Sequence, residues 1–272
     1  MLQVSQLYIY PVKSLGGIAK KTAAITPTGF KHDRRWMLVD ENNIFLSQRT
    51  HPQMALLQTA ETEKGILVMH KKDQSQQIII PFETDTINTI KVIVWDDICA
   101  ATEVNKQLNA WFSDMLHCNC KLVYMPDDSK RLVDKRYAAN DEVTSFSDAY
   151  PILMIGQSSL DHLNEKLIDS LPINRFRPNI VFTGGHAHIE DEMASFTINA
   201  INFLGVKPCS RCVITTIDQQ TADGGKEPLR TLAGYRMKNN KIYFGQNVLH
   251  QQAGQIKTGD EIKIITQQGP FI

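Results

Sequence analysis

Short runs of alternating hydrophobic and polar residues recur along this chain of 272 residues. In residues 1–10, Leu7 and Ile9 alternate with tyrosines, which is the two-residue period of a half-buried strand. The same pattern, between polar turns, predicts further strands over residues 35–39, 44–48, 65–69, 77–82, 90–95, 180–183, 196–203, 213–217, 241–244 and 261–265. Many short strands at close spacing are typical of barrels and strongly bent sheets.

Two segments show the spacing of an amphipathic helix instead. Apolar residues between Val104 and Met115 recur at helical intervals, and Thr102 stands where an N-cap is expected. A second helix is predicted over residues 159–168, where leucines share one face. The polar run 40–43 between two of the predicted strands indicates a hairpin.

The polar and charged stretch 126–136 separates two β-rich parts of the chain. A chain of 272 residues suits two compact domains better than one. We therefore predict a mainly β fold of the α+β type. Its N-terminal β-barrel-like domain would cover residues 1–125, and a second β-barrel domain with a few helices would cover residues 126–272.

Charge and composition narrow the class of protein. Lys plus Arg is 29 and Asp plus Glu is 29, so the formal net charge is zero, whereas a nonspecific nucleic-acid binder normally carries a basic surplus. No apolar run reaches the roughly 18 residues of a membrane span, and residues 1–10 lack the pattern of a signal peptide. Five cysteines, an odd number, argue against a disulfide framework. We expect a cytoplasmic protein that binds neither nucleic acid nor membrane.

The motif Cys209-Ser210-Arg211-Cys212 is the sharpest local signal. A Cys-x-x-Cys pair is compatible with a structural zinc site, a thioredoxin-like redox pair or two buried core cysteines. The chain has no second pair at zinc spacing, and the β-branched run 213–217 predicts a strand where a redox pair would open a helix. Because a guanidinium favours a neighbouring thiolate, Arg211 adds the interpretation of a metal-binding thiolate.

Three cationic motifs are candidates for binding an anion. Lys13-Ser14 follows the first predicted strand and offers an ammonium, a hydroxyl and backbone N–H groups, which suit a phosphate. Residues 33–36 (Asp-Arg-Arg-Trp) and 175–179 (Arg-Phe-Arg-Pro-Asn) place arginines at the start of strands. Each motif alone also fits an exposed surface or an internal ion pair. The stretch 186–191, with its histidines and carboxylates, fits a solvated turn better than a metal site.

Taken together, these motifs resemble the MOSC family in its two-domain form, with the N-terminal β-barrel domain attached. Within that family the chain is similar to the amidoxime-reducing molybdenum enzymes of mitochondria and their bacterial counterparts. The resemblance covers nearly the whole chain. Its motifs, in the order of the family, are Tyr10-Pro-Val-Lys-Ser14, Asp33-Arg34-Arg35-Trp36, Asp148-Ala-Tyr-Pro151, Phe176-Arg-Pro-Asn179, Cys209-Ser-Arg-Cys212, Lys226-Glu-Pro-Leu229 and Phe244-Gly-Gln246.

The resemblance implies a molybdenum–molybdopterin cofactor and a residue for each of its parts. The second cysteine of the Cys-x-Arg-Cys motif ligates the metal in the family, which points to Cys212. The Lys-Ser pair and the first arginine of the Asp-Arg motif hold the phosphate, which points to Lys13, Ser14 and Arg34. Each such charge-assisted hydrogen bond contributes roughly 1.5–3 kcal/mol.

Four further residues are expected to bind the cofactor. Arg177 and Asn179 of the Phe-Arg-Pro-Asn motif approach the pterin in the family. Asp148 and Arg211 stand in two of the other shared motifs. A single phosphate clamp without a nucleotide-binding segment favours the plain form of the cofactor over a nucleotide-extended one.

The resemblance implies an oxidoreductase that removes oxygen from N-hydroxylated compounds or N-oxides, with a small-molecule substrate. The chain lacks the cysteines of the ferredoxin domain found in many bacterial relatives. Electrons are therefore expected from a separate donor protein of the ferredoxin, flavoprotein or cytochrome type. Two alternatives remain: a sulfur carrier with a persulfide on Cys212, and a protein that only binds or delivers the cofactor.

Overall fold

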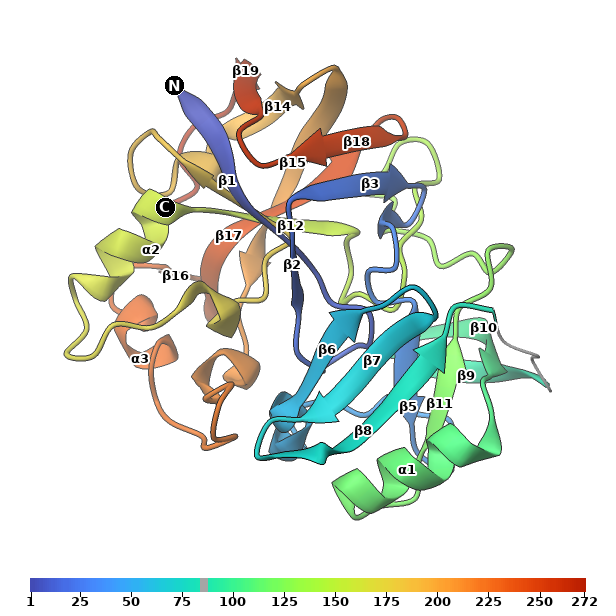
Figure 1. The fold of residues 1–272 in the computed structure, drawn as a ribbon. Helices are drawn as coiled ribbons and strands as arrows, with labels where there is room; N and C mark the ends of the chain where they lie inside the picture. Colours follow the sequence, from blue (N-terminus) through green and yellow to red (C-terminus); the bar gives the residue numbers. More distant parts are fainter. Residues whose placement is uncertain (84–87) are drawn as a thin grey trace.

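A computed structural model describes residues 1–83 and 88–272 and shows a closed barrel of seven strands beside a second β-rich half (Figure 1). The barrel runs in the order β12-β13-β1-β19-β14-β15-β17, and pairing of β12 with β17 closes it. Its strands are β1 (Leu2–Ile9), β12 (Ile152–Gly156), β13 (Ile180–Thr183), β14 (Met193–Ile198), β15 (Ile201–Ser210), β17 (Lys241–His250) and β19 (Glu261–Gln267). The predicted mainly β fold is confirmed.

Smaller sheets surround the barrel and build the other half of the molecule. Two short strands extend the barrel sheet: β2 (Ile18–Lys20) pairs with β1, and β16 (Met237–Lys238) pairs with β17. A three-stranded sheet consists of β18 (Gly254–Lys257), β3 (Thr22–Thr26) and β4 (Gly29–Phe30). The other half contains one sheet of β5 (Trp36–Val39), β11 (Lys121–Tyr124), β10 (Asp97–Glu103) and β9 (Thr89–Val94), and another of β6 (Leu57–Glu61), β7 (Gly65–His70) and β8 (Asp73–Pro81).

The described residues form three α-helices, α1 (Lys106–Leu116), α2 (Gln157–Asn164) and α3 (Leu229–Ala233). Short 3₁₀ helices lie at η1 (Pro52–Leu56), η2 (Ile173–Arg175), η3 (Ile189–Asp191) and η4 (Val213–Thr216). In the part of the chain that is described, no helix has the length and apolar character that crossing a bilayer requires.

The first strand is part of the sheet that the second half of the chain forms. In Figure 1, β1 runs through the barrel among strands from the second half of the chain, hydrogen-bonded to β13 on one side and β19 on the other. Its apolar residues Leu2, Val4 and Leu7 belong to the same core as Phe196 and Phe203. A division of the chain between residues 125 and 126 stays a prediction. β1 belongs to the first part of the chain by sequence, but it pairs with strands of the second part.

The helix predicted after Val104 is present, but its N-cap is not Thr102. The side chain of Asn105 accepts a hydrogen bond of 2.8 Å from the Leu108 N–H, whereas Thr102 lies within β10. Asparagine is among the strongest N-caps because its carbonyl oxygen satisfies a free N–H of the first turn. Buried Leu108 and Phe112 then attach the helix to the core of the N-terminal half.

Three of the elements predicted from the sequence differ from those in the structure. The run 196–203 is two strands, β14 and β15, separated by a turn in which Asn199 has a φ of 56°. Asparagine tolerates this left-handed backbone, so the turn interrupts an otherwise continuous apolar pattern. Residues 44–48 make isolated bridges rather than a strand. The second helix ends at Asn164, four residues before the predicted end.

A stacked aromatic pair stabilises the barrel. Phe196 and Phe203 lie directly opposite each other on β14 and β15, with ring centroids 5.4 Å apart and planes within 10°. Both side chains are almost completely buried.

We expect Phe196→Ala to lower the free energy of unfolding by about 3–5 kcal/mol, because a large aromatic side chain leaves a cavity in a core that cannot fully close. Urea denaturation followed by circular dichroism measures this change. Ile265→Ala on β19 is the control: its side chain is 62% exposed, so its effect should stay within about 0.5 kcal/mol. Equal effects of the two substitutions would contradict this account of the core.

Candidate functional site

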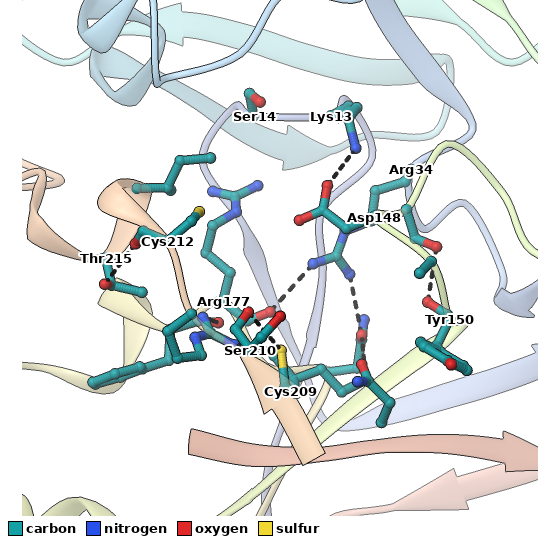
Figure 2. Close-up of a pocket in the computed structure, with 18 of the residues that line it drawn as sticks. Lys13, Ser14, Arg34, Asp148, Tyr150, Arg177, Cys209, Ser210, Cys212 and Thr215 are labelled. Carbon is teal, nitrogen blue, oxygen red and sulfur yellow. Dashed lines mark hydrogen bonds and ion pairs between the residues drawn. The ribbon is translucent and has the colours of Figure 1, made fainter. Parts of the chain in front are cut away.

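One pocket at the end of the barrel collects the eight residues that were expected to bind the cofactor. Arg35 and Arg175, the other arginines of the cationic motifs, lie outside it and pair with Asp127 and Asp218. It encloses about 770 Å³, its open mouth included. Figure 2 shows side chains from both halves of the chain pointing into it. The predicted residues that line it are Lys13, Ser14, Arg34, Asp148, Arg177, Asn179, Arg211 and Cys212. Arg49, Ser147, Tyr150, Cys209 and Thr215 are among the other residues of the lining.

Backbone hydrogen bonds join three distant segments at this pocket. The Arg34 N–H donates to the Tyr10 carbonyl (2.8 Å), and the Phe146 N–H donates to the Arg34 carbonyl (3.0 Å). The loop before β5 thereby lies between the loop after β1 and the loop before β12. These loops carry Lys13, Arg34 and Asp148 respectively.

Three of the predicted site residues have a left-handed backbone. The φ angle is 70° at Ser14, 48° at Arg34 and 55° at Arg177. Such conformations are uncommon for residues other than glycine and cost on the order of 1 kcal/mol or more each. They persist where the surrounding structure enforces them, and they gather at functional sites. No sequence pattern marked them.

Lys13 and Asp148 form an ion pair at the wall of the pocket. The Lys13 Nζ donates to the Asp148 carboxylate (2.7 Å) and to the Phe146 carbonyl (2.8 Å), and its side chain is 5% exposed (Figure 2). Burial lowers the pKa of Lys13 to about 8, although Asp148 acts in the opposite direction. The surrounding protein partly desolvates Asp148, which would raise its pKa, but the Lys13 ammonium outweighs this effect and holds that pKa well below its usual range. Asp148 therefore stays ionised and its oxygens face the pocket.

A buried arginine that the sequence analysis missed fixes the loop that presents Asp148. Arg131 donates from Nη1 to the carbonyls of Ser145 (3.0 Å) and Ser147 (2.5 Å), and from Nη2 to the carbonyl of Asp148 (3.0 Å). Its Nε donates to Asp97 (2.8 Å). Arg131 lies within the polar stretch 126–136, which the sequence pattern predicts to be a domain boundary. Its side chain is nevertheless only 4% exposed.

Arg34 and Arg177 both stack on Tyr10. Their guanidinium carbons lie 4.4 and 4.3 Å from the ring centroid. Arg34 donates to Asp33 (2.7 Å) and to the Asn179 side chain (3.1 Å). Burial lowers the pKa of Arg177 to about 10 and raises that of Tyr10 to about 12, so the arginine remains a cation at neutral pH.

Asn179 lines the pocket, but its amide is already committed. Its carbonyl oxygen accepts from Arg34 and from the Leu153 N–H (3.2 Å), and its amide nitrogen donates to the Tyr8 carbonyl (3.2 Å). The residue is 1% exposed. In this structure Asn179 positions Arg34 and joins β1 to the segment before β13.

The segment after Cys212 is the 3₁₀ helix η4, so the strand predicted over 213–217 is wrong. The hydroxyl of Thr215 donates to the Cys212 carbonyl (2.9 Å), and that of Thr216 donates to the Val213 carbonyl (2.8 Å). These local bonds satisfy the turn and override the strand preference of β-branched residues. Cys212 occupies the N-cap position, and its side chain is partly exposed to the pocket.

Each cysteine of the motif has its own arginine. Arg211 donates to the sulfur of Cys209 (3.0 Å) and to the Phe176 carbonyl (2.6 Å). Arg49, which the sequence analysis did not select, donates to the sulfur of Cys212 (3.0 Å). Burial raises the pKa of Cys209, and Arg211 offsets part of that rise. Arg211 is therefore the guanidinium beside Cys209, and the guanidinium beside Cys212 is that of Arg49.

The lining carries a surplus of positive charge that fits an anionic ligand. Its cations are Lys13, Arg34, Arg49, Arg177 and Arg211, and its carboxylate, among the described residues, is Asp148. Two guanidinium atoms of this set, Arg49 Nη1 and Arg211 Nε, are buried without a hydrogen-bond partner. Buried unpaired donors are costly, so an acceptor from a bound ligand would stabilise them. Cations for a phosphate and thiols for a soft metal meet in one cavity, which fits a metal–pterin cofactor.

The stretch 186–191 contributes no second metal site. Among residues 1–83 and 88–272, no group of three histidine, cysteine or acidic side chains could hold a metal ion. Arg236 pairs instead with buried Asp191, and Glu190 accepts from the Ser159 hydroxyl (2.8 Å).

The fold and the site define a β-barrel protein with a cation-rich, thiol-bearing pocket between its two halves. Residues 1–119 match the family model described as the MOSC N-terminal beta barrel domain, and residues 141–263 match that of the MOSC domain. The chain belongs to the MOSC-domain family with the N-terminal β-barrel domain, which confirms the resemblance.

Curated relatives connect the chain with the molybdenum cofactor. It is 29% identical to mitochondrial amidoxime-reducing component 1 of Mus musculus, over 97% of this chain and 82% of the relative, and 28% identical to that of Homo sapiens, over 97% and 83%. It is 27% identical to molybdenum cofactor sulfurase of Danio rerio, over 92% of this chain and 32% of that relative. Among solved structures, the YUAD protein of Bacillus subtilis is similar over 96% of this chain and 94% of its own, at 11% identity and a TM-score of 0.44.

Anion binding should depend on the protonation of Lys13. With its pKa lowered to about 8, Lys13 is cationic below that pH and neutral above it. Because a charge-assisted hydrogen bond is worth roughly 1.5–3 kcal/mol, sulfate binding to the cofactor-free protein should weaken about tenfold between pH 7 and pH 9. Isothermal titration calorimetry measures this affinity, and sulfate itself does not titrate in this range.

Lys13→Arg is the matched control for this pH dependence. Its guanidinium stays charged throughout the range, and the variant keeps both thiols of the pocket. Its affinity should therefore change much less than that of the wild type. A wild-type curve as flat as that of Lys13→Arg would show that Lys13 does not govern anion binding.

Proposed function

We propose that this protein binds the molybdenum cofactor through Cys212 and reduces N-hydroxylated or N-oxide compounds. The observation that carries the proposal is the convergence of a partly exposed thiol with the cations of five separate segments in one pocket. The similarity to amidoxime-reducing components supports the reaction class. When bound, the cofactor supplies two-electron chemistry that removes an oxygen atom from the nitrogen of the substrate.

Residues from both halves of the chain would hold the cofactor. Lys13, Ser14 and Arg34 would hold the phosphate, and Cys212 would ligate the metal. Arg177 is partly buried, charged and stacked on Tyr10, which makes it a rigid donor toward the pterin.

Asp148 is the ionised carboxylate of the lining and faces the open pocket, with a side chain 65% exposed. It can accept a hydrogen bond from the pterin or from a cationic substrate group such as an amidine. Arg211 is held by Cys209 and Phe176, so it contributes positive charge and fixes the first cysteine of the motif.

Electrons would come from a separate donor protein, and the location would be cytoplasmic. The five cysteines are all free in the structure, which is compatible with a reducing compartment. Both the donor and the compartment are part of the proposal.

Cys212→Ser should abolish binding of the metal. After expression with molybdate in a host that makes the cofactor, we expect elemental analysis to find about one molybdenum per wild-type chain and almost none in the variant, because a hydroxyl is a poor ligand in place of a thiolate. Reduction of a benzamidoxime by a reduced viologen should be lost with the metal. Cys118→Ser, which changes a partly exposed cysteine outside the pocket, is the control and should keep both properties.

The same protein preparations separate the alternatives. The similarity to molybdenum cofactor sulfurase favours a sulfur-carrier role as the second candidate. One additional sulfur on Cys212, seen by intact mass after alkylation, together with no bound molybdenum, would replace the reductase proposal by that role. Bound molybdenum without any reduction of N-hydroxylated compounds would indicate a protein that only binds or delivers the cofactor.

A further inference from the structure

The contact that distinguishes Cys212 comes from the other half of the chain. The Nη2 of Arg49 lies 3.0 Å from the Cys212 sulfur, across a sequence separation of 163 residues. Arg211, the sequence neighbour of Cys212, is directed to Cys209 instead. A hydrogen bond from a guanidinium to sulfur is charge-assisted when the sulfur is a thiolate, and it fixes the direction of the sulfur as well as its charge.

An aromatic side chain holds the Arg49 guanidinium in place. Its central carbon lies 4.4 Å from the centroid of the Trp95 ring, a cation–π contact. Trp95 packs in turn against Phe45, with centroids 4.9 Å apart, and its indole N–H lies 3.4 Å from Asp148. The Arg49 guanidinium thus contacts both the Trp95 ring and the Cys212 sulfur, and the same indole reaches the carboxylate of the pocket.

The backbone of Trp95 adopts a left-handed conformation, which is strained for a bulky residue. Val94 pairs with Asp97, so Trp95 and Asp96 form a two-residue hairpin loop between β9 and β10. Trp95 has a φ of 59° at the first loop position, where glycine, asparagine or aspartate is favoured. Its side chain is also 41% exposed, so little burial compensates for the strain. A bulky residue kept in such a conformation is characteristic of a functional position.

Gln48, the residue before Arg49, connects its loop by hydrogen bonds to Ser14 and to Gln219, which follows η4. Gln48 is fully buried and exchanges two side-chain hydrogen bonds with Gln219 (3.2 and 2.9 Å). It also donates to the Ser14 carbonyl (2.7 Å). Arg49 thus starts from a backbone position that is fixed relative to both Ser14 and η4.

We propose that Arg49, stacked on Trp95, is a positioning residue that donates a hydrogen bond to the Cys212 thiolate and sets its orientation and electron-donating strength. The proposal rests on Cys212 being the metal ligand. Hydrogen bonds to ligand sulfurs tune the metal in other cysteine-ligated centres. The Nη1 of Arg49 is buried without a partner and remains available to an oxygen of a bound ligand.

The first test uses the cofactor-free protein, so it does not depend on molybdenum. Arg49→Gln keeps the length of the side chain and removes its charge, and Arg49→Lys restores the charge without the fork geometry. Because the thiolate attacks iodoacetamide, alkylation of Cys212 at pH 7 should slow about tenfold in Arg49→Gln and less in Arg49→Lys. Peptide mass spectrometry follows Cys212, with Cys118 as the internal reference.

Arg136→Gln is the matched control, since Arg136 also lies over an aromatic ring, that of Tyr137, but is exposed and outside the pocket. It should alkylate at the wild-type rate. Thermal unfolding by circular dichroism confirms that each variant is folded. Alkylation of Cys212 in Arg49→Gln at the wild-type rate, or faster, overturns the proposal, and a loss of rate equal in Arg136→Gln does the same.

The second test uses the loaded protein and a spectroscopic readout. Arg49→Gln should retain molybdenum but shift the electron paramagnetic resonance of the Mo(V) state and lower the reduction potential, because the sulfur donates more strongly without its hydrogen bond. An unchanged signal overturns the role of Arg49 while leaving the proposed function intact. Absence of molybdenum from the wild type would instead refute the proposed function, and the alkylation test would still decide whether Arg49 acts on Cys212.

Discussion

The hydrogen bonding of β1 between β13 and β19 is the constraint on which the site depends. Lys13 and Ser14 follow this strand after three residues, so the position of its end decides where the ammonium and hydroxyl lie. The Tyr10 carbonyl then receives the Arg34 N–H, and the Arg34 carbonyl receives the N–H of Phe146. A strand from the start of the chain thereby becomes part of a barrel made by its end, and cationic loops from both halves meet at one rim.

This arrangement is costly in the absence of an anion. Burial lowers the pKa values of Lys13 and Arg177, which means that the protein holds each cation in an environment that disfavours its charge. Left-handed backbone at Ser14 and Arg34 adds strain. Asp148 and the Tyr10 ring offset part of the cost, but unpaired guanidinium atoms remain. A ligand with phosphate oxygens would offset the cost of these buried cations on binding, so the environment that reduces the stability of the cofactor-free protein contributes to affinity.

The sequence could predict much of this site because its chemistry lies in local motifs. A lysine–serine pair after a strand or a Cys-x-x-Cys motif can be recognised without coordinates. The order of the motifs along the chain supported the prediction that they act together, and their residues do line one pocket. Six of the seven barrel strands overlap runs that were predicted from alternation, and β12 was not predicted. Elsewhere, local side-chain hydrogen bonds made the prediction wrong. Threonine hydroxyls stabilise a 3₁₀ helix at residues 213–216, and Asn105 rather than Thr102 caps the first helix. Periodicity does not register such hydrogen bonds.

The contact between Arg49 and Cys212 lies outside what any local pattern can supply. It depends on the Gln48–Gln219 pair, on the stacking of Trp95 and on the pairing of β1 with the strands of the second half. The two cysteines of one short motif consequently face different surroundings. Cys209 is tied by Arg211 to its own half of the chain, whereas the sulfur of Cys212 lies between the halves and receives its hydrogen bond from the N-terminal one. A metal bound at Cys212 would therefore respond to both halves, which gives the N-terminal half a chemical role in addition to its part in the fold.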